Sequence, residues 1–305
     1  MSVYNEKEEW LRESIDSILN QTFSNFEFII IVDNPENKLA INLLREYEKK
    51  DNRLKIYINE VNMGLVKSLN KAIGLCNCEF IARMDADDYS YPERLKKQID
   101  FFMENESIDL CATGVVIMNE FGEELYKAKI YGTTPTKAKK SIIYRNIFPH
   151  GSWMVRKSSM DRVGGYNDIE QAEDYDLLLR MLLNNMKITV LPEYLFKYRL
   201  RVNGISYKNL YKQKNIMLEM AKQYLNTTNT GNDYKFISPD FTNENNDIEK
   251  YFYYQNLYTE SIACLRNNKK FRGVKGIFIV LLCSAYKRKE IKSAIALKFI
   301  DKIYR

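Results

Sequence analysis

A short apolar segment of the chain ends in three carboxylates. Residues 81–88 read IARMDADD, so Asp85, Asp87 and Asp88 follow residues that suit a buried strand. A buried carboxylate is costly unless it is hydrogen-bonded or paired with a cation. Carboxylates two positions apart at the end of an extended strand can face one ligand, such as a divalent cation beside a diphosphate. A solvated turn before the next helix explains the same residues, and spacing alone leaves both interpretations open.

A second acidic pair, Glu173 and Asp174, begins an apolar segment of helical character, EDYDLLLRMLL. Acidic side chains in the first turn of a helix interact favourably with its dipole, and this structural explanation is the simpler one. The functional alternative is that one carboxylate is a general base, which takes a proton from an attacking hydroxyl. The single histidine, His150 in a PHGS turn, is expected to be a hydrogen-bonded structural residue.

Composition and missing motifs exclude several classes of site. One histidine in 305 residues excludes a multi-histidine metal centre. The five cysteines are scattered without a CxxC motif, so reduced thiols are expected, and Cys76 with Cys78 would supply only half of a zinc site. The chain has no GxxxxGK[ST] motif, which excludes a P-loop. It also has no glycine-rich turn after a first strand, which argues against a dinucleotide fold.

Strand-like and helix-like segments alternate through the first part of the chain. Apolar runs of strand length occupy residues 26–32, 54–58, 79–84 and 110–118, and amphipathic helices are predicted over 5–21, 39–47, 65–73, 95–102 and 173–183. The alternation predicts an α/β fold with a mostly parallel mixed sheet flanked by helices. Ligands bind at the carboxyl ends of such strands, so Asp33 and the acidic cluster of residues 85–88 are expected to share one sheet edge.

The positive charge is concentrated at the end of the chain. Residues 265–305 hold twelve Lys or Arg and two Asp or Glu, a balance of +10, so the rest carries −4 of the net +6. This asymmetry does not indicate a nucleic-acid-binding surface over the whole protein. The apolar run 276–286 is too short to span a bilayer and is flanked by lysines. It suits a packing helix with a basic rim, or peripheral attachment to anionic lipid on the inner face of the cell membrane. The absence of a signal peptide predicts a cytoplasmic location.

The order of these segments resembles one enzyme family. The motifs follow one another along residues 1–200: VYN (3–5), ILNQTF (18–23), IIIVDN (29–34), NMGLVKSLNKAI (62–73), ARMDADDYSYPERL (82–95), HGS (150–152), VGGYN (163–167) and AEDYDLLLR (172–180). The ordered set resembles the family 2 glycosyltransferases of the GT-A fold, especially bacterial enzymes of surface-polysaccharide assembly. Any single motif is weak, whereas the full order is specific.

The resemblance implies a GT-A domain, a Rossmann-like arrangement, over residues 1–204. Its nucleotide-binding half would be 1–90 and its acceptor half 91–204. A mostly helical extension would follow over 205–305, with a flexible loop near 226–247 because that stretch is rich in Asn, Thr and Asp. The implied reaction is inverting transfer from a nucleotide sugar, most often UDP-linked, to a saccharide or lipid-linked acceptor.

The resemblance also implies roles for single residues on the donor side. Tyr4 and Asp33 would line the uracil and ribose, Lys67 and Asn70 would flank the nucleotide, and Asp85 would approach the ribose or sugar.

For the chemical step, the resemblance implies one cation and one base. Asp87 would bind Mn²⁺ or Mg²⁺ across the diphosphate, and Asp174 would deprotonate the acceptor hydroxyl. The chain departs from the family at Arg201, where a histidine is common. Two other classes stay open: a non-catalytic glycosyltransferase-like subunit, and a metal-dependent nucleotidyltransferase, which also places paired carboxylates on an α/β sheet.

The start of the sequence gives one more expectation. Residues 1–3 are few for a central strand, which normally has about five or six residues. We therefore expect the 305-residue chain to fold and to bind donor weakly.

Overall fold

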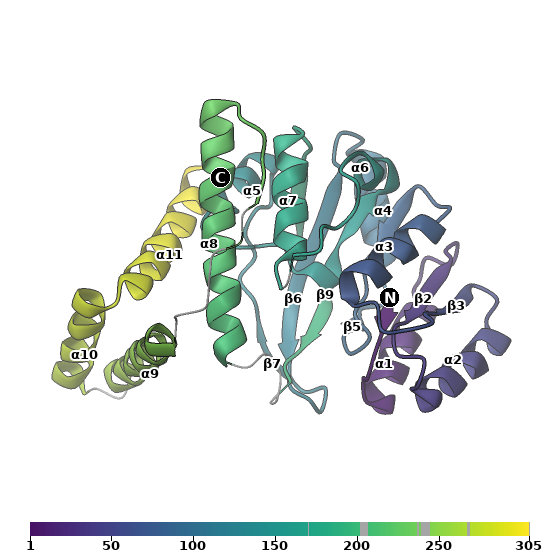
Figure 1. Ribbon diagram of the computed structural model, residues 1–305, viewed down its shortest axis with the longest axis horizontal. Helices are drawn as coiled ribbons and strands as arrows, with labels where there is room; N and C mark the ends of the chain where they lie inside the picture. Colours follow the sequence, from purple (N-terminus) through teal and green to yellow (C-terminus); the bar gives the residue numbers. More distant parts are fainter. Residues whose placement is uncertain (170, 202–206, 237, 239–244, 267–268, 305) are drawn as a thin grey trace. The chain divides into compact units, whose positions relative to one another are not determined.

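The structure is a computed structural model that describes residues 1–169, 171–201, 207–236, 238, 245–266 and 269–304 (Figure 1). The strands are β1 (Ser2–Val3), β2 (Phe28–Val32), β3 (Leu54–Ile58), β4 (Phe80–Ala82), β5 (Tyr89–Ser90), β6 (Leu110–Met118), β7 (Glu124–Lys127), β8 (Met154–Arg156) and β9 (Ile188–Arg199). The helices are α1 (Glu8–Leu19), α2 (Lys38–Lys50), α3 (Leu65–Leu75), α4 (Arg94–Glu104), α5 (Pro135–Ser141), α6 (Lys157–Arg162), α7 (Glu173–Leu183), α8 (Tyr207–Thr230), α9 (Asn245–Arg266), α10 (Lys270–Cys283) and α11 (Ala285–Ile303).

Backbone contacts divide the chain into two compact units. Met1–Lys140 and Asn146–Val202 form the first, and Ser141–Arg145 and Asn203–Arg305 form the second. The boundary that the resemblance implies, after residue 204, falls in the segment 202–206, outside the described residues.

The first unit begins with a parallel sheet in the order β1-β2-β3. Side chains of β2 alternate between two apolar layers, as the period of a strand requires. Ile30 and Val32 pack in one core cluster with Leu11 of α1 and Leu44 of α2. Ile29 and Ile31, which point to the other face, pack with Ala72 of α3. Burial on both faces explains why the sequence of β2 is continuously apolar.

The second sheet is mixed and has the order β4-β8-β6-β9-β5, with β7 on β6. A mixed sheet agrees with the predicted fold class, but the pairing of the strand after α3 was not predicted. That strand, β4, has three residues and pairs antiparallel with β8, while β1 pairs with β2. The parallel ladder of this sheet joins β6 and β9 instead. Residue-by-residue hydrophobicity cannot reveal such pairing, because a short apolar strand can pair in either direction.

A cavity of about 380 Å³ lies between the start of β2 and β4. Its walls include Phe28 and Ile29 of β2, Phe80 and Ala82 of β4, and Met1. The α-amino group of Met1 donates a hydrogen bond to the Ile29 carbonyl, 2.9 Å away. Burial, reinforced by the charge of Arg83, lowers the pKa of this amino group to about 5.

The second unit is helical in its described parts. Of the segment 226–247, where a flexible loop was expected, residues 226–230 belong to α8 and residues 245–247 to α9, while 237 and 239–244 lie outside the described residues. The hydroxyls of Thr228 and Thr230 donate to the carbonyls of Leu225 and Asn226, and the Gly231 amide donates to the Thr227 carbonyl at the end of α8. Within the described residues, no helix is long and apolar enough to cross a membrane.

Candidate functional site

The loops that follow β1 and β2 are hydrogen-bonded to each other. Asn34 donates its side-chain amide to the Asn5 side chain at 2.7 Å, and Asn37 donates to the Tyr4 carbonyl at 3.0 Å. The amide of Asp33 donates to the Val3 carbonyl at 2.8 Å, which extends the ladder. Tyr4, half exposed, and Asp33 therefore lie at the same carboxyl edge of the parallel sheet.

Asp33 is buried, and its carboxylate organises the loop after β3. Oδ1 accepts hydrogen bonds from the Asn59 side chain at 2.7 Å and from the Met63 amide at 2.9 Å, and Oδ2 accepts from the Gly64 amide at 2.9 Å. Gly64 has φ +84° and begins α3. The same carboxylate that was predicted to meet the nucleotide therefore fixes the start of the helix that carries Lys67.

Lys67 and Asn70 lie on α3 with different surroundings. Lys67 is exposed, whereas Asn70 is half buried. Asn70 Nδ2 donates to the Tyr166 carbonyl, and Asn70 Oδ1 accepts from the Tyr166 amide, both at 2.9 Å. Gly165 has φ +72°, and a Cβ there would come within 2.6 Å of Asn70 Oδ1. Asn70 thus holds the VGGYN segment against α3.

Tyr166 continues this connection to the HGS turn. Its hydroxyl lies 2.7 Å from His150 Nε2, and the His150 ring packs edge-on against Trp153. Burial, with the nearby charge of Arg83, lowers the pKa of His150 to about 3, so the imidazole is neutral at pH 7. The histidine is hydrogen-bonded and structural in this state, in agreement with the prediction.

The three carboxylates of the IARMDADD segment have three environments. Asp85 Oδ1 accepts from Arg83 at 2.5 Å, and the Asp85 side chain keeps 31% exposure. Burial opposes ionisation of Asp85, but Arg83 and His150 lower its pKa below the usual range. Asp85 is therefore an ionised carboxylate with access to a ligand.

Asp87 is ion-paired with Arg201. Arg201 Nε lies 2.6 Å from Asp87 Oδ2, and Nη2 lies 2.5 Å from the same oxygen. The Arg201 side chain is 41% exposed, and Glu6 lies 3.8 Å from Nη2. Burial raises the pKa of Asp87, although Arg201 opposes the shift. The residue predicted to bind the metal thus already faces a positive charge.

Asp88 is buried and structural. Its Oδ1 accepts the Arg199 amide at 2.8 Å, while Oδ2 has no hydrogen-bond partner among the described residues. Burial, with the charges of Asp85 and Asp87, raises its pKa well above the usual range. Asp88 therefore anchors the end of β9, so one of the three carboxylates belongs to the fold rather than to a ligand site.

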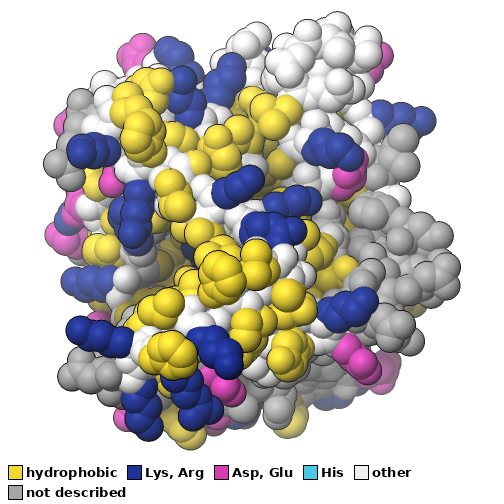
Figure 2. All heavy atoms as spheres, turned by 90° about the vertical axis from the view of Figure 1, so that its left-hand side faces the viewer, with side chains coloured by type: hydrophobic (Ala, Val, Ile, Leu, Met, Phe, Trp, Pro, Cys, Tyr) yellow, Lys and Arg dark blue, Asp and Glu magenta, His cyan; other side chains and the backbone are white. Residues whose placement is uncertain are grey.

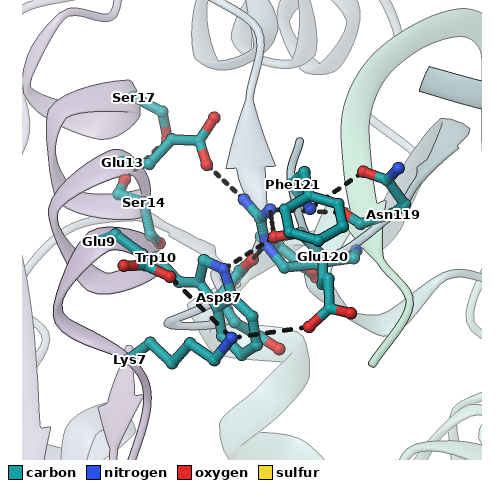
Figure 3. Close-up of polar contacts among 12 residues, drawn as sticks. Lys7, Glu9, Trp10, Glu13, Ser14, Ser17, Asp87, Asn119, Glu120 and Phe121 are labelled. Atoms are coloured by element: carbon teal, nitrogen blue, oxygen red, sulfur yellow. Dashed lines mark hydrogen bonds and ion pairs between the residues drawn. The ribbon is translucent and has the colours of Figure 1, made fainter. Parts of the chain in front are cut away.

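Arg199 joins the acidic segment to α1 and to the turn after β6. Its Nε donates to the Asp87 carbonyl at 2.7 Å and its Nη1 to the Glu120 carbonyl at 3.1 Å, while Nη2 pairs with Glu13. Figure 3 shows Glu13 on the α1 side of this cluster and Asn119 to Phe121 on the other. The sequence did not single out Arg199, because its partners are mostly backbone carbonyls distant along the chain.

A further arginine, Arg94, was also missed. Arg94 is fully buried and donates to the carbonyls of Gly151 at 2.9 Å and Arg83 at 3.0 Å. Burial, with the like charge of Arg83, lowers the pKa of Arg94 to about 9. Arg94 lies in the YPERL stretch that follows the acidic segment. Its charged side chain did not indicate in the sequence that the residue is buried. It ties the acidic strand end to the HGS turn.

Asp174 lies in the first turn of α7. Its Oδ2 accepts from the Asn146 side chain at 2.8 Å, and its Oδ1 accepts from the Tyr175 amide at 2.7 Å. Burial, with the neighbouring Glu173 charge, raises the pKa of Asp174 to about 7. A carboxyl group that titrates near neutral pH and is held in one orientation suits a general base.

The neighbouring acids, Glu173 and Asp176, are more deeply buried than Asp174. Glu173 is largely buried, and burial raises its pKa. Asp176 is fully buried, and its Oδ2 accepts from Asn167 at 3.0 Å and from Arg180 at 2.7 Å. Asp176 therefore connects α7 to the VGGYN segment. Asp174 is more exposed than Glu173 and Asp176, and its own pKa is raised.

The described residues contain no cluster of three or more His, Cys, Asp or Glu side chains that could hold a metal ion. The donor set still suits a hard cation, because Asp87 and Asp85 are oxygen ligands and Asp87 already attracts Arg201. Mg²⁺ is commonly bound by one or two carboxylates, with substrate phosphates and water completing the coordination. Asp87 is therefore the residue that fits a diphosphate-bound Mg²⁺ or Mn²⁺.

Comparison with known proteins gives relatives that share most of the chain. It is 36% identical over 214 residues to an uncharacterized glycosyltransferase, MJ1057, of Methanocaldococcus jannaschii, covering 70% of this chain and 74% of the relative. It is 39% identical over 189 residues to the O-antigen biosynthesis glycosyltransferase WbnJ of Escherichia coli, covering 61% and 73%.

Solved structures confirm the predicted GT-A type of α/β fold. The crystal structure of S. aureus TarS 1–349 in complex with UDP-GlcNAc aligns with a TM-score of 0.56 at 22% identity, over 73% of this chain and 68% of that one. Another TarS chain is covered for 41% of its length. At this identity, the likeness establishes the fold alone. The sequence profile described as glycosyl transferase family 2 matches residues 1–164, more than half of the chain. The chain therefore belongs to glycosyl transferase family 2.

Proposed function

We propose that the chain is a metal-dependent, inverting hexosyltransferase of bacterial surface-polysaccharide synthesis. Its donor is a UDP-linked sugar, and its acceptor is a saccharide or a lipid-linked saccharide. Support for the polysaccharide role comes from relatives named for O-antigen and amylovoran biosynthesis. Support for the donor comes from the TarS structures, which contain UDP-GlcNAc or UDP.

The observation that carries the proposal is the state of Asp174. Its carboxyl group is fixed by Asn146 and the Tyr175 amide, and its pKa is raised to about 7. A base must be ionised to accept a proton, yet basic enough to hold it during the transition state. At neutral pH, Asp174 satisfies both requirements.

The proposed step is a single displacement. Asp174 takes the proton of the acceptor hydroxyl while that oxygen forms a bond to the anomeric carbon. The bond from the anomeric carbon to the diphosphate oxygen breaks, and its electron pair leaves with UDP. Because the hydroxyl attacks opposite the leaving group, the anomeric configuration inverts.

The remaining predicted residues bind and orient the donor in this proposal. Tyr4 and Asp33 lie at one sheet edge, where the uracil and ribose would bind, and Lys67 is an exposed cation on α3 beside them. Asp85 would orient the ribose or sugar. Asp87 would hold Mn²⁺ or Mg²⁺, which supplies positive charge to the leaving diphosphate.

A donor screen tests the proposal. The purified chain would be mixed with each of a panel of nucleotide sugars, with Mn²⁺ or with EDTA, and UDP release and UDP affinity would be measured. We expect a UDP-sugar to be consumed in the presence of metal, and Asp87→Ala to remove the metal-dependent part of UDP affinity. Calorimetry that gives equal UDP affinity with EDTA and with metal would contradict the metal site.

The same screen separates the alternative classes. A nucleotidyltransferase would consume a sugar phosphate with a nucleoside triphosphate and release pyrophosphate. A non-catalytic subunit would bind UDP without turnover of any donor. Either result would overturn the assignment of a glycosyltransferase reaction.

A further inference from the structure

Helix α10 presents one apolar face to solvent. Phe271, Val274, Phe278 and Leu282 are exposed by 86, 60, 61 and 63%. They are separated by three or four positions, so they lie along one side of the helix. Such a continuous exposed stripe is unusual on a protein surface and commonly marks an interaction site.

The opposite face of α10 already has its partner in the same unit. Gly273 and Gly276 lie so close to α9 that a Cβ would come within 2.6 Å of Leu265 Cγ and 1.9 Å of Ser261 Oγ. Val280, on the same side, is fully buried. The glycines therefore let α10 pack tightly on α9, and the side of α10 that carries Phe271 and Phe278 faces solvent.

Helix α11 repeats the pattern. Ile295, Phe299 and Ile303 are exposed by 61, 63 and 57% and are spaced by four positions. Exposed lysines alternate with them, at Lys292, Lys298 and Lys302. An exposed apolar row bordered by lysines is typical of helices that lie in a membrane interface.

The charges of this region are mostly positive. The described residues 269–304 contain ten Lys or Arg and two Asp or Glu. One of these acids, Glu290, is neutralised within the unit by ion pairs with Lys214 and Lys287. Figure 2 looks onto the side on which α9, α10 and α11 are drawn in Figure 1, and there apolar and basic side chains are intermixed with few acidic ones.

We infer that the outward faces of α10 and α11 dock on an anionic lipid bilayer surface. The lysines and arginines would contact lipid phosphates, and the phenylalanines, Ile295 and Leu282 would enter the boundary between headgroups and acyl chains. A second copy of the chain is a poorer occupant, because two surfaces of this charge repel each other. The inference does not depend on the sugar-transfer reaction.

Vesicle sedimentation of the full chain tests the inference. Vesicles of phosphatidylcholine alone are compared with vesicles that also contain phosphatidylglycerol, at low and at high salt. We expect binding to the anionic vesicles only, weakened by salt. Phe271→Ser with Phe278→Ser should weaken it at least about tenfold, because two apolar side chains leave the lipid boundary. Lys292→Gln with Lys298→Gln should weaken it about tenfold or more.

Phe121→Ser is the matched control, because Phe121 is 81% exposed and lies in the other unit. It should bind vesicles as the unchanged chain does, and circular dichroism should show that each variant is folded. Three results would overturn the inference: equal or absent binding to both vesicle types, equal loss in Phe121→Ser, or a dimer in light scattering that Phe271→Ser with Phe278→Ser abolishes while vesicle binding is absent.

Discussion

Arg201 binds the Asp87 carboxylate through two nitrogens, at 2.6 and 2.5 Å from the same oxygen. In the proposed enzyme, a divalent ion and Arg201 therefore compete for one oxygen. Arg201 is 41% exposed, so its side chain has room to move when the donor diphosphate arrives. Arg201, which departs from the family pattern, is thus the ion-pair partner of Asp87, the proposed metal ligand.

Removing the competitor should strengthen metal binding. Arg201→Gln leaves Asp87 without its ion pair, and Mn²⁺ affinity in the presence of UDP should rise roughly two- to fivefold, the worth of a partly exposed pair. Electron paramagnetic resonance of free Mn²⁺ measures it. Arg12→Gln is the control, because Arg12 is similarly exposed in an ion pair with Glu8. Unchanged Mn²⁺ affinity in Arg201→Gln would show that Arg201 does not compete.

The raised pKa of Asp174 predicts how activity depends on pH. The base acts when ionised, so the transfer rate at saturating donor should rise as pH increases through about 7. A rate that stays constant between about pH 6 and pH 8 would contradict Asp174 as the base.

The same pKa predicts how stability depends on pH. The folded pKa, about 7, lies above the ordinary value of 3.8, so the folded state retains a proton that the unfolded state has lost. This contribution to stability is complete below about pH 4 and is lost as pH rises through about 7. Asp174→Asn should therefore raise the melting temperature at pH 8 more than at pH 4, measured by calorimetry. An equal effect at both pH values would contradict the raised pKa.

Lys67 and Asn70 should differ when each is replaced by alanine. Asn70→Ala removes both hydrogen bonds to the Tyr166 backbone and should destabilise the fold by about 1–3 kcal/mol, seen as a lower denaturation midpoint. Lys67→Ala, on the same helix but exposed, should change stability by less than about 0.5 kcal/mol and weaken UDP binding. The reverse pattern would mean that Asn70 is the nucleotide contact and Lys67 the structural residue.

The cavity between β2 and β4 predicts the effect of an added strand. About six apolar residues joined to Met1 would fill the cavity and replace a buried amino group by a peptide N–H. The melting temperature and UDP affinity should both rise, because apolar burial and a longer β1 support Tyr4. Six Gly and Ser residues are the control. If the apolar extension raises neither quantity above the control, the cavity does not limit the site.

The sequence predicts α1–α4, α7, β2–β4 and β6 because their apolar patterns are strong, whereas β8 and β9 were not predicted. The edges of β3 and β6 match the predicted runs residue for residue. The carboxylates were found because acidic residues are conspicuous after apolar runs. What remained hidden depends on contacts across the chain: the antiparallel pairing of β4, and the buried Arg94 and Arg199, whose partners are mostly backbone carbonyls.

The different partners of the three carboxylates could not be predicted from the sequence either. Asp85, Asp87 and Asp88 are chemically alike in the sequence. Only the folded structure shows that Asp88 accepts a hydrogen bond from the Arg199 amide and that Asp87 pairs with the Arg201 side chain. The end of α8 was predicted too early because Thr and Asn are poor helix formers, whereas residues 226–230 continue the helix and the hydroxyls of Thr228 and Thr230 bond to its carbonyls.

The central claim is that Asp174 is the base of a transfer from a UDP-sugar, and one rate comparison tests it most directly. The single-turnover transfer rates of the unchanged chain and of Asp174→Asn are measured with the donor found by screening and its acceptor, together with UDP affinity. We predict a fall of roughly 10²- to 10⁴-fold in the rate with little change in UDP affinity, because asparagine keeps the size and polarity of the side chain but accepts no proton. A nearly normal rate in Asp174→Asn would contradict the account and direct attention to Glu173 or Asp176.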